Sequence, residues 1–416
     1  MQRIEADVLI PGTDDVVKNG CVLLDSNKIV FVGPVESAPR SKDGEKTVSV
    51  PVVMPGMWDS HAHLAGLKTA DLTEGLRTPA AVMIARAVKD AENALAAGFT
   101  SVREVGGFGL PLAKASDEGT INAPHIYGSG APLSQTGGHG DIHSFPVDFV
   151  IQVEETWGLG VLCDGVPECL KAVRNQLRAG AKLIKICASG GVLSELDHPL
   201  HQQFSFEEMR AMVEEAGRAE RIVAAHCHGK PGIMAALNAG CRTIEHGTFL
   251  DMEAAELMIE KNAILVPTRF VFDRLLKTAK QSGIPDYAYQ KLAAISEQHR
   301  QAVQLAVKKK IKIALGTDIF TSGLDTAVPW GMHAHELGHL VEAGMSPLQA
   351  IQAATSVAPE TLGPQAPRSG QLKAGYDADV IAVSKTPLSD VTVLASPENV
   401  THVWKSGRLL KEPSKT

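Results

Sequence analysis

A regular alternation of short apolar runs with longer helical stretches constrains the fold of this chain more than any other feature. Residues 80–98 and 206–220 are examples of the helical stretches. This alternation is typical of parallel βα units, and eight such units close into a barrel. We therefore predict an α/β fold with a (β/α)8 TIM-type barrel. The eight candidate strands are residues 52–63, 100–106, 125–131, 182–190, 221–229, 242–248, 263–269 and 312–318.

Both ends of the chain contain strand-like segments outside this pattern. Residues 21–33 form two short apolar runs around an Asp-Ser-Asn turn, which predicts a hairpin. Residues 377–383 and 400–410 are strand-like again. We predict a small β-sandwich domain built from both termini, residues 1–53 and 365–416, and a barrel domain over residues 54–364.

Composition and charge exclude several classes of protein. The 416 residues are 44% hydrophobic, enough for a large core, and 40 basic against 47 acidic residues give a net charge of -7. With no basic block, we expect no nucleic-acid partner.

No apolar run reaches the roughly 18 residues of a membrane span, so we expect no membrane partner. The N-terminus lacks a signal-peptide pattern, so we expect a cytoplasmic location, with secretion left open. The six cysteines form no C-x-x-C pair and are expected to be buried, reduced thiols.

Polar residues with metal-ligand chemistry lie where the candidate strands end. Because the carboxyl ends of barrel strands face the same mouth, residues far apart in sequence are expected to meet there. Alternation along a strand places both imidazoles of an H-x-H pair on one face, where they can bind one metal. Residues of this kind at the ends of five strands predict a metal site from His61, His63, Lys185, His226, His246 and Asp318, and His228 lies beside it at the end of the fifth strand.

Lys185 is unusual because it lies inside the apolar run Leu-Ile-Lys-Ile-Cys, which ends at Gly190-Gly191. A lone ammonium is strongly disfavoured in a low-dielectric interior and tends to lose its proton. A lysine in a buried strand therefore indicates chemistry rather than packing.

The motifs SHAHLAG, KICASGG, AAHCHG, IEHG and LGTD resemble those of the binuclear amidohydrolase superfamily. This resemblance implies that His61 and His63 bind a first metal with Asp318, and that His226 and His246 bind a second. It also implies that Lys185 is carboxylated by carbon dioxide and that the carbamate bridges both metals. A desolvated lysine offers the free amine that this reaction needs. Zinc is the metal expected in the family, although these ligands also accept manganese or cobalt.

Longer stretches, such as MPGMWDSHAH and GSGAPLSQTGGHGDI, resemble the ochratoxinase group and the Xaa-Pro-dipeptidase-like amidohydrolases, in the branch that also contains imidazolonepropionases. The resemblance implies cleavage of the amide bond to a C-terminal amino acid in N-acyl amino acids of the ochratoxin A type, with release of L-phenylalanine. The alternative is an Xaa-Pro or other dipeptidase or carboxypeptidase. In either case a metal-bridging hydroxide would attack the carbonyl, and Asp318 would pass the proton to the leaving amine. Such relatives form homo-oligomers, including octamers, so we expect one here.

Charge favours an acidic substrate. Two divalent cations against a carbamate, an aspartate and a hydroxide leave a net charge of about +1, which attracts a carboxylate. His139 and His228, with His143 as a weaker candidate, are expected to hold the substrate carbonyl or carboxylate; the alternative is that they are loop or supporting histidines. Loops 132–167 and 192–204 are expected to select the substrate.

Three other functions fit the sequence less well. Residues 335–339, HELGH, match the H-E-x-x-H pattern of zinc proteases, but they fall in the helix expected after the eighth strand. A mononuclear deaminase would carry H-x-x-E after the fifth strand and lack the bridging lysine, whereas this chain has AAHCHGKPG there. A non-catalytic scaffold would be expected to have lost metal ligands.

Overall fold

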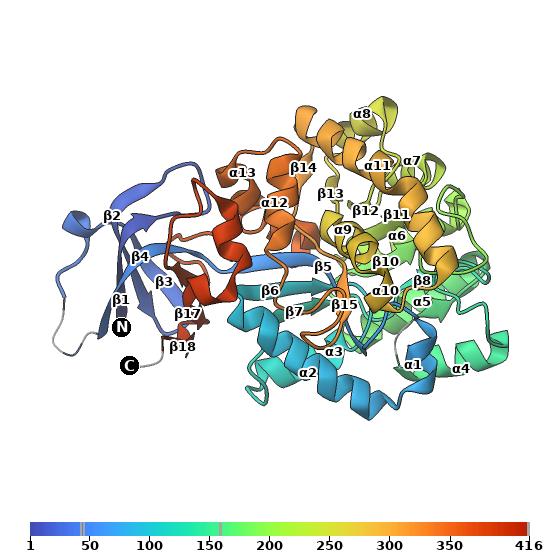
Figure 1. Ribbon diagram of the computed structural model, residues 1–416, viewed down its shortest axis with the longest axis horizontal. Coiled ribbons are helices and arrows are strands. Elements are labelled where there is room, and N and C mark those ends of the chain that lie inside the picture. The colour runs from blue at the N-terminus through green and yellow to red at the C-terminus, as the bar shows by residue number, and fades with distance from the viewer. Residues whose placement is uncertain (42–43, 45, 158–159, 414–416) are drawn as a thin grey trace.

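Both ends of the chain contribute to one seven-stranded sheet, which lies at the left of Figure 1. In the computed structural model, which describes residues 1–41, 44, 46–157 and 160–413, the strand order is β18-β17-β16-β4-β1-β2-β3. Only β1 and β4 pair in parallel. The strands are β1 (Gln2–Leu9), β2 (Val17–Asp25), β3 (Lys28–Pro34), β4 (Lys46–Pro55), β16 (Val380–Val383), β17 (Val400–Lys405) and β18 (Arg408–Lys411).

This terminal sheet curls back on itself around its own apolar cluster. The start of β3 meets the segment before β16, where the Ile29 amide donates to the Tyr376 carbonyl at 2.9 Å. Ile4, Val22 and Trp404 are fully buried between the two halves. The sandwich that was predicted from both termini is therefore present, and the predicted hairpin at 21–33 is confirmed as β2 and β3.

The barrel lies at the right of Figure 1. Its first and eighth strands are joined by the Ser60 amide, which donates to the Leu315 carbonyl at 2.8 Å, and its third and fourth by the Lys182 amide, which donates to the Gly128 carbonyl at 2.9 Å. The predicted barrel is thus closed. The barrel strands are β5 (Met57–Leu67), β6 (Phe99–Glu104), β7 (His125–Gly128), β10 (Ile184–Cys187), β11 (Val223–Cys227), β12 (Thr243–His246), β13 (Ile264–Val266) and β14 (Lys312–Ile313). Short strands β8 (Leu133–Ser134), β9 (Val161–Leu162) and β15 (Ile319–Thr321) extend it.

The first predicted strand, residues 52–63, is divided between the two sheets. Its beginning belongs to β4, which continues to Pro55 in the terminal sheet, and its end belongs to β5. Gly56 marks the crossing, because a Cβ there would lie 2.0 Å from the Thr100 Oγ1. A glycine is required at this crossing because any side chain would overlap the buried side chain of Thr100.

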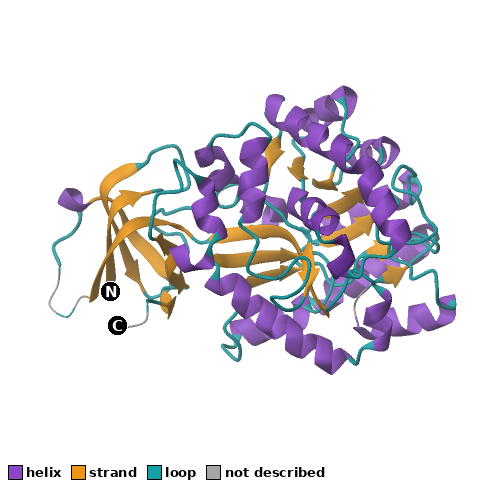
Figure 2. Cartoon of the chain, viewed as in Figure 1, coloured by secondary structure: helices purple, strands orange, loops and turns teal. Residues whose placement is uncertain are grey.

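Helices cover the outside of the barrel strands (Figure 2). The two predicted helical stretches are confirmed as α2 and α6. The α-helices are α1 (Thr73–Arg77), α2 (Ala80–Ala96), α3 (Gly109–Asp117), α4 (Val147–Trp157), α5 (Gly165–Ala179), α6 (Phe206–Arg218), α7 (Lys230–Ala239), α8 (Met252–Glu260), α9 (Arg269–Lys277), α10 (Ala279–Ser282), α11 (Asp286–Lys308), α12 (His335–Glu342) and α13 (Pro347–Ala353). The 3-10 helices are η1 (Val35–Ser37), η2 (Ala358–Gln365), η3 (Val391–Ala395) and η4 (Pro397–Asn399).

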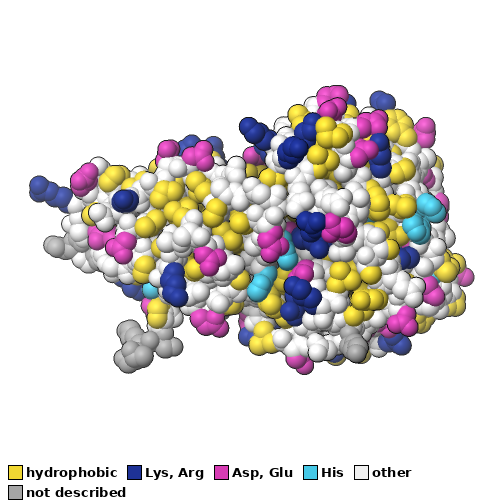
Figure 3. Space-filling model, turned by 45° about the horizontal axis from the view of Figure 1, so that its top comes forward, with side chains coloured by type: hydrophobic (Ala, Val, Ile, Leu, Met, Phe, Trp, Pro, Cys, Tyr) yellow, Lys and Arg dark blue, Asp and Glu magenta, His cyan; other side chains and the backbone are white. Residues whose placement is uncertain are grey.

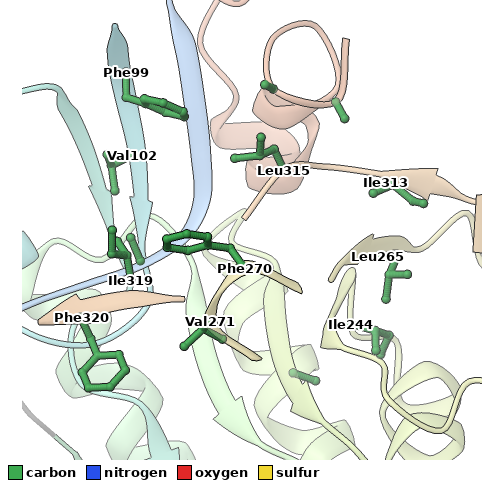
Figure 4. Close-up of a cluster of buried hydrophobic side chains, with 14 of the residues drawn as sticks. Phe99, Val102, Ile244, Leu265, Phe270, Val271, Ile313, Leu315, Ile319 and Phe320 are labelled. Atoms are coloured by element: carbon green, nitrogen blue, oxygen red, sulfur yellow. The ribbon is translucent and has the colours of Figure 1, made fainter. Parts of the chain in front are cut away.

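A large apolar cluster joins the strands to these helices (Figure 4). Phe99 and Val102 of β6 lie near Phe270 of α9 and Ile319 of β15, and all four side chains are buried. Truncation of a buried phenylalanine such as Phe270 typically costs about 3–5 kcal/mol of stability. This packing fixes the carboxyl ends of the strands.

The domain boundaries at 53/54 and 364/365 stay a prediction. Residues 42–43, 45 and 414–416 of the predicted terminal domain, and 158–159 of the predicted selecting loop, lie outside the described residues. Figure 3 shows Lys and Arg side chains interspersed with Asp and Glu over one face, without a patch of either sign on it. Within the described part of the chain, no helix combines the length and apolarity needed to cross a membrane.

Candidate metal centre

The carboxyl ends of the barrel strands surround one chamber. All of the predicted metal ligands line it, although they come from strands spread over more than half of the chain. His139 and His228 also line it, whereas His143 does not: its Nδ1 instead accepts from the Leu196 amide at 3.0 Å. The ligands gathered here are His61, His63, Lys185, His226, His246 and Asp318.

His61, His63 and Asp318 form the first cluster. The Asp318 Oδ1 lies 3.5 Å from the His61 Nε2 and 3.1 Å from the His63 Nε2. The other ring nitrogen of each histidine faces an acceptor: the His61 Nδ1 lies 2.7 Å from a Glu245 oxygen, and the His63 Nδ1 lies 2.9 Å from the Gly106 carbonyl. Because each Nδ1 donates to its acceptor, both Nε2 lone pairs are free for a metal.

The second cluster contains His226 and His246. The His226 Nδ1 and the His246 Nε2 lie 3.0 Å apart, a separation at which both can bind one ion. Their outer nitrogens face oxygens, at 3.3 Å to the Gly190 carbonyl and 2.7 Å to the Thr268 Oγ1. A ring nitrogen of His228 joins this pair within 4.8 Å. The structure thus brings His228 to the second cluster as well as to the chamber.

Lys185 lies beside the first cluster, with its Nζ 3.5 Å from the His61 Nε2. Its side chain is buried in β10, and burial lowers the pKa of its ammonium. Burial thus shifts Lys185 toward the free amine, which is the direction that the sequence indicated.

Two charged residues that the sequence analysis did not identify support His61 from inside the barrel. Arg103 of β6 donates from Nη2 to both oxygens of Glu245 of β12 at 2.7 Å, and both side chains are fully buried. Burial would raise the pKa of Glu245, but Arg103 and His61 hold it well below its usual range. Glu245 is therefore ionised, and it can only accept the His61 proton. A charged residue inside the run Arg-Thr-Ile-Glu-His was the signal that could have revealed it.

The protonation states suit metal binding. Burial lowers the pKa of His61 to about 4 and that of His228 to about 3, so both are neutral at pH 7. Burial acts to raise the pKa of Asp318, but His61 and His63 outweigh it and keep the carboxylate ionised. Neutral imidazoles and ionised carboxylates are the forms that bind metal.

Two of the predicted ligands have a strained backbone conformation. His246 and Asp318 have positive φ angles of 66° and 58°. A non-glycine residue in the left-handed region is uncommon and is often found at a functional site. These angles turn each side chain at the end of its strand.

His139 lies over the second cluster. Its ring stacks on His226, with 4.1 Å between the ring centroids, and its Nδ1 lies 2.9 Å from the Ser194 Oγ. Ser194 belongs to the predicted selecting loop 192–204. His139 is therefore placed where it can contact a substrate bound at the metals.

The remainder of the chamber wall is apolar. In the described part of the chain, its only charged side chains are Lys185 and Asp318. The predicted loops supply some of the apolar wall, but α9, α11 and the segment after β5 supply more. The apolar side chains include Leu67, Leu72, Leu76, Ile142, Val192, Leu193, Val271, Phe272, Leu275, Leu292 and Phe320.

The HELGH motif has a different role. It forms α12, as the sequence indicated, and Glu336 is buried there. Its two carboxylate oxygens accept from the amides of Arg269 and Phe270 at 2.9 and 2.6 Å, so Glu336 caps the start of α9. Neither candidate group of metal ligands found among the described residues includes His335 or His339.

The donor set fits two metal ions. Imidazole nitrogens and carboxylate oxygens suit zinc, manganese or cobalt, and the outer nitrogens of the four histidines already face oxygen atoms.

Comparisons with known proteins agree with this site. Residues 52–410 match the amidohydrolase family. Ochratoxinase from Aspergillus niger is 45% identical over 424 aligned residues, which cover 99% of this chain and 86% of the relative. The crystal structure of A. niger ochratoxinase superposes with a TM-score of 0.92 over 99% of this chain and 96% of that chain. A prolidase complexed with N-methylphosphonate-L-proline is 31% identical, with a TM-score of 0.92 over 99% of this chain and 100% of that chain. The chain therefore belongs to the amidohydrolase family and is a metal-dependent amide hydrolase.

Proposed function

We propose that this enzyme cleaves the amide bond to a C-terminal amino acid in N-acyl amino acids of the ochratoxin A type and releases L-phenylalanine. The observation that carries the proposal is the chamber itself, which places an apolar wall around the metal ligands. Such a wall favours an aromatic side chain and disfavours a charged one, which would lose its hydration without gaining a partner. The 45% identity to ochratoxinase supports the same substrate class.

In this proposal His61, His63 and Asp318 hold one metal, His226 and His246 hold the other, and Lys185 bridges them as a carbamate. Zinc is the proposed metal. When bound, two such ions polarise the amide carbonyl and lower the pKa of a water molecule enough for it to attack. Lys185 is suited to its role because it is buried, and burial lowers the pKa of its ammonium.

Asp318 is proposed to move the proton. Its carboxylate is ionised and lies at the mouth of the chamber, where it can accept a proton from the attacking water and deliver it to the leaving amine. His139 and His228 are proposed to contact the substrate, since both line the chamber. For His143 the proposal is weaker, because it does not line the chamber and reaches only the loop amide of Leu196.

An Xaa-Pro dipeptidase or another carboxypeptidase-like activity is the second candidate. It is favoured by the 31% identity and 0.92 TM-score to the prolidase structure. The same residues would carry out both reactions, so only the substrate distinguishes the two functions.

The oligomeric state and the cellular location of the enzyme are also proposed. We propose a homo-oligomer, with the octamer as the first state to test, and a cytoplasmic location.

The test is release of free amino acid from ochratoxin A, N-acyl-phenylalanine, Xaa-Pro and Xaa-Arg dipeptides, with zinc-loaded protein and a chelated control. The proposal predicts zinc-dependent release of phenylalanine from the first two substrates. Activity confined to Xaa-Pro would select the dipeptidase, and activity on none of them would refute both functions.

A further inference from the structure

A loop at the chamber mouth is built around His139. Gly191 lies so close to the ring that a Cβ at this position would be 1.9 Å from the His139 Nδ1. The Gln203 Oε1 accepts from the His139 backbone amide at 3.0 Å, which fixes the backbone as well. The Nδ1 edge of the ring therefore faces the loop, while the ring face stacks on His226.

The centre of this loop is the carboxylate of Asp197. The Gly191 amide and the Gln203 Nε2 donate to its Oδ2 at 2.9 and 3.0 Å, and the Lys291 Nζ lies 3.3 Å from its Oδ1. All three groups can only donate a hydrogen bond. Burial would raise the pKa of Asp197, but the hydrogen bonds from Ser194 and Gly191 and the nearby charge of Lys291 hold it below its usual range. Asp197 is therefore ionised and can only accept.

The proton positions follow from this constraint. The Ser194 Oγ lies 2.5 Å from the Asp197 Oδ1 and 2.9 Å from the His139 Nδ1. A serine hydroxyl has one hydrogen, and the carboxylate has none to give, so the hydroxyl hydrogen points to Asp197. The Ser194 Oγ must then accept from His139, which places a hydrogen on Nδ1. Nε2 of the neutral ring is left as a lone pair, and it makes no hydrogen bond to the described part of the protein.

We propose that Asp197 and Ser194 are positioning residues that fix the proton of His139 on Nδ1, so that Nε2 accepts a hydrogen bond from the N–H of the scissile amide instead of donating to the substrate carbonyl or carboxylate, as the sequence had suggested. This inference rests on the proposed amidase function. An N-acyl amino acid with an ionised carboxylate has its amide N–H as its one donor near the bond that breaks. Lys291 holds the loop in this arrangement, because its Nζ also donates to the Ser194 carbonyl at 2.7 Å.

The proposal predicts discrimination between secondary and tertiary amides. N-acetyl-phenylalanine has the N–H, and N-acetyl-N-methyl-phenylalanine lacks it. In the zinc-loaded enzyme, Ser194→Ala frees His139 to place its proton on Nε2, so kcat/KM should fall about ten-fold more for the first substrate than for the second, the value of one hydrogen bond. The readout is the ratio of kcat/KM for the two substrates. A loss of folded or metal-loaded enzyme lowers both values by the same factor and leaves this ratio unchanged.

Two control variants separate positioning from simple loop support. Ser194→Thr keeps the hydroxyl and should restore the discrimination. Leu196→Ala changes an exposed side chain, 76% accessible, of the same loop and should affect both substrates equally. An equal loss on both substrates in Ser194→Ala would overturn the proposal.

A second readout does not depend on activity. Nitrogen-15 NMR of histidine-labelled protein, with His139→Gln used to assign the signal, reports which ring nitrogen carries the hydrogen. We expect it on Nδ1 in the wild type and a shift toward Nε2 in Ser194→Ala. A wild-type hydrogen on Nε2 would refute the inference. If the wild type cleaved neither substrate while the Nδ1 hydrogen was observed, the proposed function would fail and the positioning of His139 would stand.

Discussion

Replacement of Glu245 by Gln tests whether the barrel interior prepares His61 for metal binding. The carboxylate accepts two bonds from Arg103 and one from the His61 Nδ1, all at 2.7 Å, with every partner buried. A glutamine keeps the shape but has only one oxygen. Whichever way the amide is turned, Arg103 faces an NH2 group on one side and has no counter-charge.

The expected magnitudes follow from this geometry. Removal of one partner of a buried ion pair costs about 3–5 kcal/mol of the free energy of unfolding. If the NH2 group faces His61, the His61 Nδ1 must accept, and its proton moves to Nε2, where it blocks the metal. Loss of a residue that orients a metal ligand lowers metal affinity about 10- to 100-fold. Glu214→Gln is the matched control, because Glu214 pairs with Arg210 on an exposed face of α6, and its cost should stay below about 0.5 kcal/mol.

Two assays separate the two effects. Urea unfolding in the presence of a chelator measures stability without a contribution from metal, and zinc titration against a competing chelator measures affinity. The double variant Arg103→Met, Glu245→Leu replaces the ion pair by apolar side chains and should recover most of the stability but not the affinity. Wild-type zinc affinity in Glu245→Gln, or recovery of affinity in the double variant, would refute the orienting role of Glu245.

Three further variants are predicted to behave as follows. Lys185→Ala should lose most of its bound metal, measured by elemental analysis, with partial rescue by a short carboxylic acid; full occupancy would contradict the bridging role. His228→Asn should change kcat or KM for N-acyl-phenylalanine, and its assignment as a substrate contact fails if neither changes. Burial raises the pKa of Asp90 to about 7, so the native state holds a proton that the unfolded chain releases above about pH 4. Wild-type stability should therefore fall relative to Asp90→Asn between about pH 4 and 7, by at most about 1.4 kcal/mol per pH unit in urea unfolding at fixed zinc; parallel curves would contradict this.

The sequence predicted the barrel, and the meeting of the candidate ligands at one end of it, because both depend on local periodicity. Parallel strands that are buried on both faces are continuous apolar runs, and their carboxyl ends must share one mouth whatever the loops do. Polar residues at those ends, such as His226 and Asp318, could therefore be placed together before any contact was known. The division of residues 52–63 at Gly56 was not predicted, since an apolar run does not show which sheet it joins.

The contacts that orient the ligands were missed for two different reasons. Ser194 and Asp197 lie in a loop whose path no periodicity specifies. They contact Lys291, which is about a hundred residues away in the sequence. Arg103 and Glu245 lie inside strands, and the reasoning applied to Lys185 would have found them. A charged residue in a buried run must have a partner, whichever residue type it is.

Arg103 and Glu245 also influence the protonation of Lys185. Glu245 acts to raise the pKa of Lys185, and Arg103 acts to lower it. Because Arg103 binds both oxygens of Glu245, it offsets part of the interior negative charge that would otherwise help to keep Lys185 charged. The same pair that directs the His61 lone pair toward the metal site therefore also acts on Lys185, whose pKa burial lowers toward the free amine that carboxylation requires. One buried ion pair thus acts on two of the proposed ligands, so this metal site depends on the barrel interior as well as on the residues at its mouth.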